Sequence, residues 1–122
     1  MDLSKTPGQL ANEAADAIRA LNHKTLNDSY EHPPAVGETA YALRTLIERM
    51  PQALEQMERA LLDFGSTNAI RMDDGTEPTA AAAECVAAIA VAQPLLKQLQ
   101  AELAIVSART SHMGGHWPED DD

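Results

Sequence analysis

The nearest approach to a metal-binding pattern lies close to the C-terminal end of the chain. His112 and His116 are four residues apart, and the acidic run Glu119–Asp122 follows them. Two imidazoles at that spacing on a helix can share a metal ion. Gly114 and Gly115 separate the two histidines, however, and glycine opposes the helix that would bring them together. We therefore expect a loose metal-scavenging tail at most, and we predict no built metal site and no cofactor.

Two other side chains with chemical potential, His23 and Cys85, lie in helical patterns. His23 invites comparison with the histidine of phosphorelay transfer domains, but the lysine and glycine pattern expected after it is missing, which favours a solvated surface residue. Cys85 falls on an apolar stripe, where a thiol acts as a small apolar residue, and its neighbour Glu84 does not activate it. As the only cysteine, it also excludes an internal disulfide and a cysteine-based zinc site.

Motifs of the common enzyme classes are missing from the chain. There is no glycine-rich phosphate loop, no nucleophile elbow, no H-E-x-x-H and no carboxylate–histidine signature of a di-metal bundle. Glu55 and Arg59 form an ordinary i,i+4 surface pair. The neighbouring charges read as one solvated face, comprising Glu38, Arg44, Glu48, Arg49 and Glu58. We predict a protein without enzymatic activity.

Composition limits the partners and the compartment. Of the 122 residues, 44% are hydrophobic and only 3% aromatic, which suits one small domain with one core. The 19 acidic and nine basic residues give a formal net charge of -10, which disfavours nucleic acid and anionic membrane as partners. The N-terminal residues lack the apolar region of a secretory signal, and the longest apolar run, Cys85–Ala92, is too short to cross a bilayer. We predict a cytoplasmic protein.

The elements that must position any site are three helices. The first is expected over residues 7–26, with Thr6 as N-cap, Pro7 in the first turn and Gln9 completing a capping box. Its apolar residues recur at spacings of three and four and are Leu10, Ala14, Ala17, Ile18 and Leu21. We expect this helix to end before His32-Pro33-Pro34, because a residue before proline avoids the helical region of backbone angles.

The second helix is expected over residues 35–64 and carries the clearest pattern in the chain. An unbroken 4-3-4-3 spacing, typical of four heptads, links Val36, Ala40, Leu43, Ile47, Met50, Leu54, Met57, Leu61 and Phe64. The flanking residues Leu46, Ala53 and Ala60 widen this stripe. Gly65 is the expected stop.

The third helix is expected over residues 78–109 and repeats the pattern. Asp73-Asp74-Gly75 supplies turn chemistry before it, and Pro78 suits its first turn. The same spacing links Cys85, Ile89, Ala92, Leu96, Leu99, Leu103 and Val106. Two long stripes joined by about a dozen residues predict an antiparallel hairpin.

Both long helices contain an internal proline, Pro51 and Pro94. The apolar register continues through both, so we expect kinks rather than ends. One interpretation places both prolines outside the stripe on the solvent-facing convex side. The other follows from register: if the hairpin brings position 51 opposite position 91, the prolines are neighbours and open the carbonyls of Ile47 and Ala90 at one level. Such a level can hinge, bind a partner or admit a small ligand.

Two stretches resemble segments of small uncharacterised actinobacterial α-helical proteins. They are Ala17–His23 and Met50–Gln56, and the likeness extends from Ala14 to Leu62. The resemblance implies a bacterial source and no catalytic residue. It does mark Pro51 and Gln52 as a unit, so we take Met50, Pro51, Gln52 and Pro94 as the candidate kink or partner site.

Residues 111–122 have no helical periodicity, and we expect a mobile acidic tail. Trp117, the only tryptophan, is a candidate anchor that either docks on the bundle or contacts a partner.

The predicted fold is all-α. It is an antiparallel three-helix bundle, residues 1–110, with two long proline-kinked helices, and a second copy can complete it to a four-helix type. The function that we expect is protein–protein interaction, as a scaffold, adaptor or regulator that binds a protein partner or itself in a homodimer. One alternative is a regulatory sensor that binds a small ligand between the kinked helices. The other is an acidic inhibitor or antitoxin-like protein that occupies a basic partner.

Overall fold

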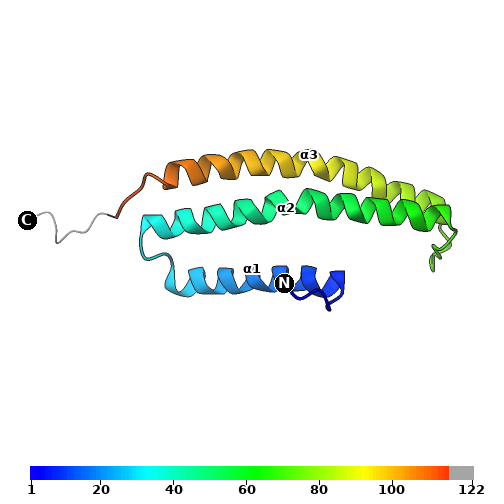
Figure 1. Ribbon diagram of the computed structural model, residues 1–122, viewed down its shortest axis with the longest axis horizontal. Coiled ribbons are helices and arrows are strands. Elements are labelled where there is room, and N and C mark those ends of the chain that lie inside the picture. Colours follow the sequence, from blue (N-terminus) through cyan, green and yellow to red (C-terminus); the bar gives the residue numbers. More distant parts are fainter. Residues whose placement is uncertain (116–122) are drawn as a thin grey trace, which may run out of the picture.

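The computed structural model describes residues 1–115, and this part of the chain folds into three helices. They are α1 (Pro7–Asp28), α2 (Pro33–Ser66) and α3 (Pro78–Thr110) (Figure 1). No strand occurs within this described part. The predicted all-α, three-helix fold is therefore confirmed, and each helix begins and ends within two residues of the expected positions. His116, Trp117 and the acidic run lie outside the described residues.

Each helix begins at a residue that binds its free backbone N–H groups. At α1 the predicted capping box is present: Gln9 N donates to Thr6 Oγ1 at 3.2 Å, and Thr6 N donates to Gln9 Oε1 at 2.9 Å. At α2, His32 Nδ1 accepts from the N–H of Ala35. Pro33 and Pro34 therefore occupy the first turn of α2. Backbone N–H groups in this turn have no acceptor within the helix, so a proline, which has no N–H, breaks no hydrogen bond there.

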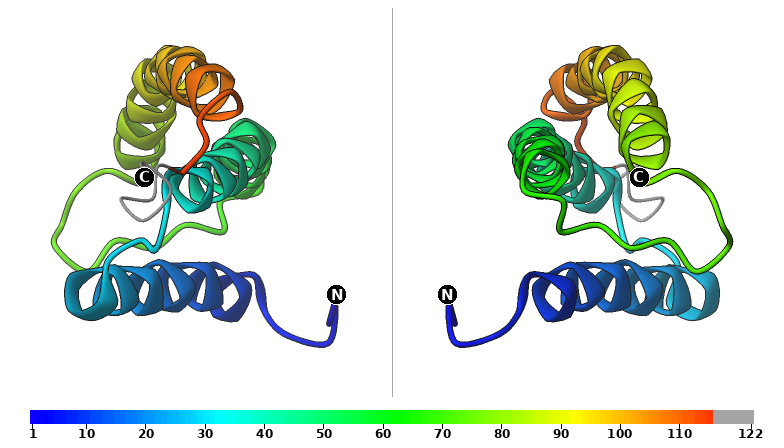
Figure 2. Two further views of the ribbon diagram at one scale, coloured as in Figure 1. Left: turned by 90° about the vertical axis from the view of Figure 1, so that its left-hand side faces the viewer. Right: turned by 90° about the vertical axis from the view of Figure 1, so that its right-hand side faces the viewer.

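The two long helices form an antiparallel hairpin, and α1 is set apart from it. Figure 1 shows α3 running back along the whole of α2, while the shorter α1 extends from near the N-terminal end of α2 and in this view reaches a little past its middle. The end-on views of Figure 2 show α1 crossing below the hairpin at an angle. No Cα of α1 lies within 8 Å of a Cα in α2 or α3. The tight packing of the molecule is therefore confined to the α2–α3 pair.

The contact line between α2 and α3 differs from the predicted one. On α2 the half-buried or buried residues along it follow a heptad spacing and are Ala40, Arg44, Ile47, Pro51, Leu54, Glu58, Leu61 and Gly65. On α3 the corresponding residues are Ala82, Val86, Ile89, Gln93, Leu96, Gln100, Leu103, Ser107 and Thr110. Every second member of each predicted stripe is on this line. The members between them are replaced by the residue that follows in the chain, so Pro51 takes the place of Met50 and Gln93 takes that of Ala92.

Packing geometry explains the shift. A stripe wide enough for two neighbours cannot be centred on one neighbour, and each helix is rotated so that only one edge of its stripe meets the other helix. Small residues then lie where the helices approach closely. Cys85, Met50 and Met57 belong to the predicted stripes but do not lie in the core, because all three are exposed.

One close approach joins the two ends of the hairpin that are farthest apart in sequence. A Cβ built on Gly37 in α2 would lie 2.9 Å from Oγ1 and 3.0 Å from Cβ of Thr110 in α3. Thr110 is buried, and its hydroxyl donates to the carbonyl of Val106 at 2.7 Å. Glycine is needed at this position because a larger residue would push the last turn of α3 away.

Candidate interaction surface

The half-stripes that the hairpin leaves uncovered form one apolar surface, which we call the open face. Its members come from the C-terminal half of α2 and from the length of α3, and they are Met50, Met57, Phe64, Cys85, Ala88, Leu95, Leu99 and Val106. Met57 is 54% exposed, Phe64 53% and Leu95 60%. Isolated exposed apolar side chains are ordinary on a protein surface, but a continuous row over two helices is typical of a binding surface.

Register shows that the two halves of the open face lie on the same side of the hairpin. On α2 the uncovered residues Met50 and Met57 each precede a contact residue by one position, and on α3 Leu99 does the same. Two antiparallel helices are related by a local two-fold axis through their contact line. Residues that precede a contact residue by one position therefore lie on the same side of the hairpin in both helices.

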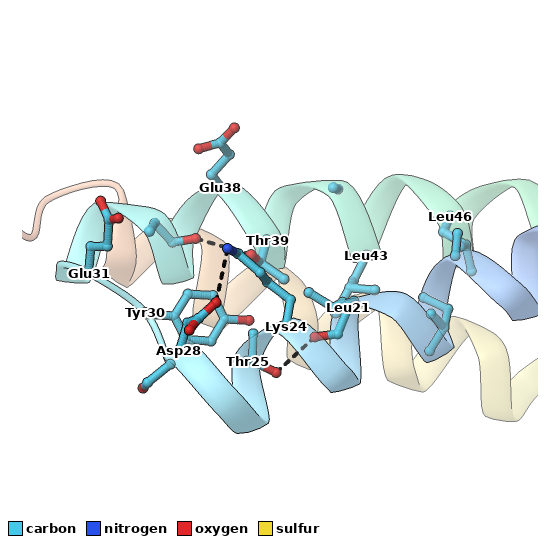
Figure 3. A pocket seen from close by; sticks show the side chains of 15 residues that line it. Leu21, Lys24, Thr25, Asp28, Tyr30, Glu31, Glu38, Thr39, Leu43 and Leu46 are labelled. Atoms are coloured by element: carbon cyan, nitrogen blue, oxygen red, sulfur yellow. Dashed lines mark hydrogen bonds and ion pairs between the residues drawn. The ribbon is translucent and has the colours of Figure 1, made fainter.

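The first helix covers only the N-terminal end of this side. Between α1 and α2 there is a groove of about 850 Å³, lined by Ile18 and Leu21 of α1 and by Leu43 and Leu46 of α2. Figure 3 shows Leu21 next to Leu43. Leu43 belongs to the same predicted stripe as Met50 and Met57. The groove therefore includes one member of this stripe, Leu43, whereas Met50, Met57 and Phe64 do not line it.

Polar groups line the outer end of that groove. Lys24 Nζ lies 3.1 Å from Asp28 Oδ2, and Glu38 of α2 stands at the opposite rim. Both partners of the Lys24–Asp28 pair are mostly exposed. Water screens such a pair strongly, so it orients the end of α1 rather than holding α1 against α2.

Ion pairs elsewhere in the described chain are also on the surface. Arg44 pairs with Glu48 at 3.0 Å, and the predicted pair between Arg59 and Glu55 is present at 3.4 Å. None of these four residues belongs to the open face, but Glu102, which precedes the contact residue Leu103 as Leu95 precedes Leu96, is one charged residue in its row on α3. A surface of this kind favours a partner with an apolar face over a strongly charged one.

The structure places the two internal prolines at one level of the hairpin. Pro51 and Pro94 line the same open hollow of about 370 Å³, together with Gln93, Lys97 and Gln100. Both long helices continue through their prolines and bend near the middle (Figure 1). Pro94 is exposed as one interpretation expected, whereas Pro51 is half-buried on the contact line, so its predicted solvent-facing position was wrong.

Two glutamines of α3, which the sequence reading missed, bond to α2 at this level. Gln100 Nε2 donates to the carbonyl of Ile47 at 3.4 Å, and this is the carbonyl that loses its helical donor because Pro51 has no N–H. Gln93 Nε2 donates to the carbonyl of Pro51 at 2.9 Å. The signal for them was available: an internal proline frees a carbonyl, and a glutamine seven residues from another lies on the same helix face.

The remaining candidate residues are dispersed. Met50 lies on the open face, Gln52 is exposed beside Pro51, and His23 is exposed on α1, well away from both. Trp117 lies outside the described residues. Within residues 1–115 no three potential metal ligands come together. The candidate kink or partner site is therefore split between the open face, which holds Met50, and the proline level.

By length and composition alone, α3 could cross a membrane. An 18-residue window within it has a mean hydropathy of 1.6 and few charges. The longest uninterrupted apolar run is shorter than this window. The expectation based on that run therefore missed the window, in which a few polar residues separate apolar ones. A soluble bundle helix passes the same test, so the absence of a membrane partner stays a prediction.

Comparison of the chain with protein-family models, curated proteins and solved structures gave no match. The likeness to actinobacterial proteins therefore stays a prediction that rests on the two short stretches quoted for it.

Proposed function

We propose that the protein is a non-enzymatic helical module that acts in the cytoplasm through protein–protein contact, with the open face as its binding surface. One observation carries the proposal: three heptads of apolar side chains are uncovered on two helices that are otherwise well packed against each other. Covering such a row with a helix from another chain removes apolar surface from water without disturbing the hairpin.

The test compares two charge substitutions on α2 that start from equal exposure. Met57 and Leu62 are both 54% exposed, but they are five residues apart and so point to different sides of the helix. We expect tagged wild-type protein and Leu62→Glu, expressed at native level in the host, to retain the same bound chains. Met57→Glu should lose them. Equal retention by all three proteins would contradict the proposal.

The sensor alternative has a specific location in the structure, the hollow lined by Pro51 and Pro94. Its walls offer the amides of Gln93 and Gln100 and the ammonium group of Lys97. Both amides already donate to α2 carbonyls, so a ligand there would have to compete with those bonds. A thermal shift by a metabolite that Lys97→Met abolishes would favour the sensor over the interaction module.

A further inference from the structure

We propose that the chain that covers the open face is a second copy of this protein, so that two hairpins pack through their open faces in a homodimer. This inference rests on the proposed function, because it uses the same surface. It adds the identity of the partner.

The solvent-exposed area of the chain is large enough for a second copy of the hairpin to cover part of it. The structure exposes 9611 Å², whereas a globular chain of this mass exposes about 6,400 Å². An allowance of about 2,000 Å² for the residues that follow α3 still leaves roughly 1,200 Å² of excess per chain. A stable homodimer buries about 1,000–2,500 Å² on each subunit. The excess therefore lies within the range that one further copy can cover.

Both sides of the open face mix large and small apolar residues. Met50 and Met57 alternate with Ala53 on α2, and Leu95 and Leu99 follow Ala88 on α3. In a two-fold arrangement that lays the α2 side of each copy against the α3 side of its partner, each contact between these sides is made twice. Methionine adapts its shape to such a surface at low cost.

Electrostatics permit this contact despite the net charge of -10. Four of the acidic residues are the last four of the chain, and the row of the open face contains one charged residue, Glu102. Self-association therefore brings two acidic molecules together through a surface that is mostly uncharged.

A membrane is a different partner for the same apolar helix, and the contacts of α3 argue against it. The side chains of Gln93 and Gln100 donate hydrogen bonds to carbonyl groups of α2. If α3 entered a bilayer alone, these hydrogen bonds would break and the two amides would have no acceptor in the hydrocarbon. The acidic net charge also repels an anionic membrane surface.

Sedimentation of the full chain over a wide concentration range tests the proposal. We expect wild type and Leu62→Glu to form a dimer, and Met57→Glu and Leu95→Glu to weaken it at least about tenfold. Circular dichroism checks that all four proteins keep their helices. Cys85, the single thiol, gives an independent readout: its labelling by a maleimide should slow as the protein concentration rises, because dimerisation covers it.

Three outcomes would overturn the homodimer. They are a wild-type monomer at every concentration, equal weakening by the Leu62 and Met57 substitutions, and a monomer that floats with vesicles of phosphatidylglycerol and phosphatidylethanolamine. If the purified chain is monomeric but Met57→Glu still loses a different protein in the host, the homodimer fails while the proposed function stands. If neither association occurs, both fail.

Discussion

At the residue scale, the contact between Gly37 and Thr110 makes a clear prediction. Replacing a helical glycine by alanine normally stabilises a helix by about 1 kcal/mol. At Gly37 the added Cβ would lie 2.9 Å from Thr110 Oγ1, and we expect Gly37→Ala to destabilise the protein by about 1–2 kcal/mol instead. Chemical denaturation measures the change.

Gly65 is the matched control for this substitution. It lies in the same helix, and a Cβ there meets nothing within 4 Å. Gly65→Ala should therefore be neutral or stabilising. If both variants shifted the denaturation midpoint in the same direction, the close approach of α2 and α3 at this end would be wrong.

A second residue-scale prediction concerns pH and Glu77, the N-cap of α3. The N–H groups of Thr79 and Ala80 donate to its carboxylate at 3.0 and 2.9 Å, and they hold the pKa of Glu77 below its ordinary value. Because the folded pKa is the lower one, the contribution to stability is complete above the unfolded pKa. It is lost as the pH falls through the folded value.

The variant Glu77→Gln isolates this effect from the other carboxylates. We expect wild type to be more stable than the variant at pH 7, and the difference in unfolding free energy to shrink towards pH 3. A difference that is the same at both pH values would show that the charge of Glu77 does not contribute to capping α3.

At the scale of elements, the proline level predicts a coupling between the two long helices. In wild type, Gln100→Leu leaves the carbonyl of Ile47 without a donor, which should cost about 1 kcal/mol or more. In a Pro51→Ala background the new backbone N–H can donate to that carbonyl. In that background, Gln100→Leu should therefore lower the free energy of unfolding by less than it does in wild type.

A double-mutant cycle of these two substitutions measures the coupling. We expect an interaction energy of about 1 kcal/mol between positions 51 and 100. Gln98, exposed on the same helix, supplies a control: Gln98→Leu should cost the same in both backgrounds. Additive effects of Pro51→Ala and Gln100→Leu would mean that the side-chain bond does not replace the missing helical one.

At the scale of the whole molecule, the net charge of -10 predicts how salt acts on association. Two acidic chains repel each other, and added salt screens this repulsion. We expect the homodimer to tighten as NaCl rises from 50 to 300 mM, as followed by the sedimentation midpoint. A basic partner, as in the acidic-inhibitor alternative, would instead bind more weakly with salt. The sign of the salt effect therefore separates the two proposals.

The sequence by itself determined the elements, and the physical reason is that their causes are local. Thr6 with Gln9, the first-turn prolines and the heptad spacing set the three helices to within two residues. The continuous apolar register also predicted that neither Pro51 nor Pro94 ends a helix. The level shared by the two prolines was one of two interpretations of the sequence, because it depended on which residues the antiparallel hairpin sets opposite each other.

Only the tertiary structure decided which edge of each stripe meets the other helix. Periodicity defines a face about 100° wide, and the choice between Met50 and Pro51, or between Ala92 and Gln93, depends on how closely the backbones approach. That choice set Gln93 and Gln100 against the carbonyls of α2 and turned Cys85, Met57 and their neighbours outward. The candidate site follows from this rotation of the two helices about their own axes. The spacing of residues within one helix does not predict the rotation, because it depends on how the two helices pack together.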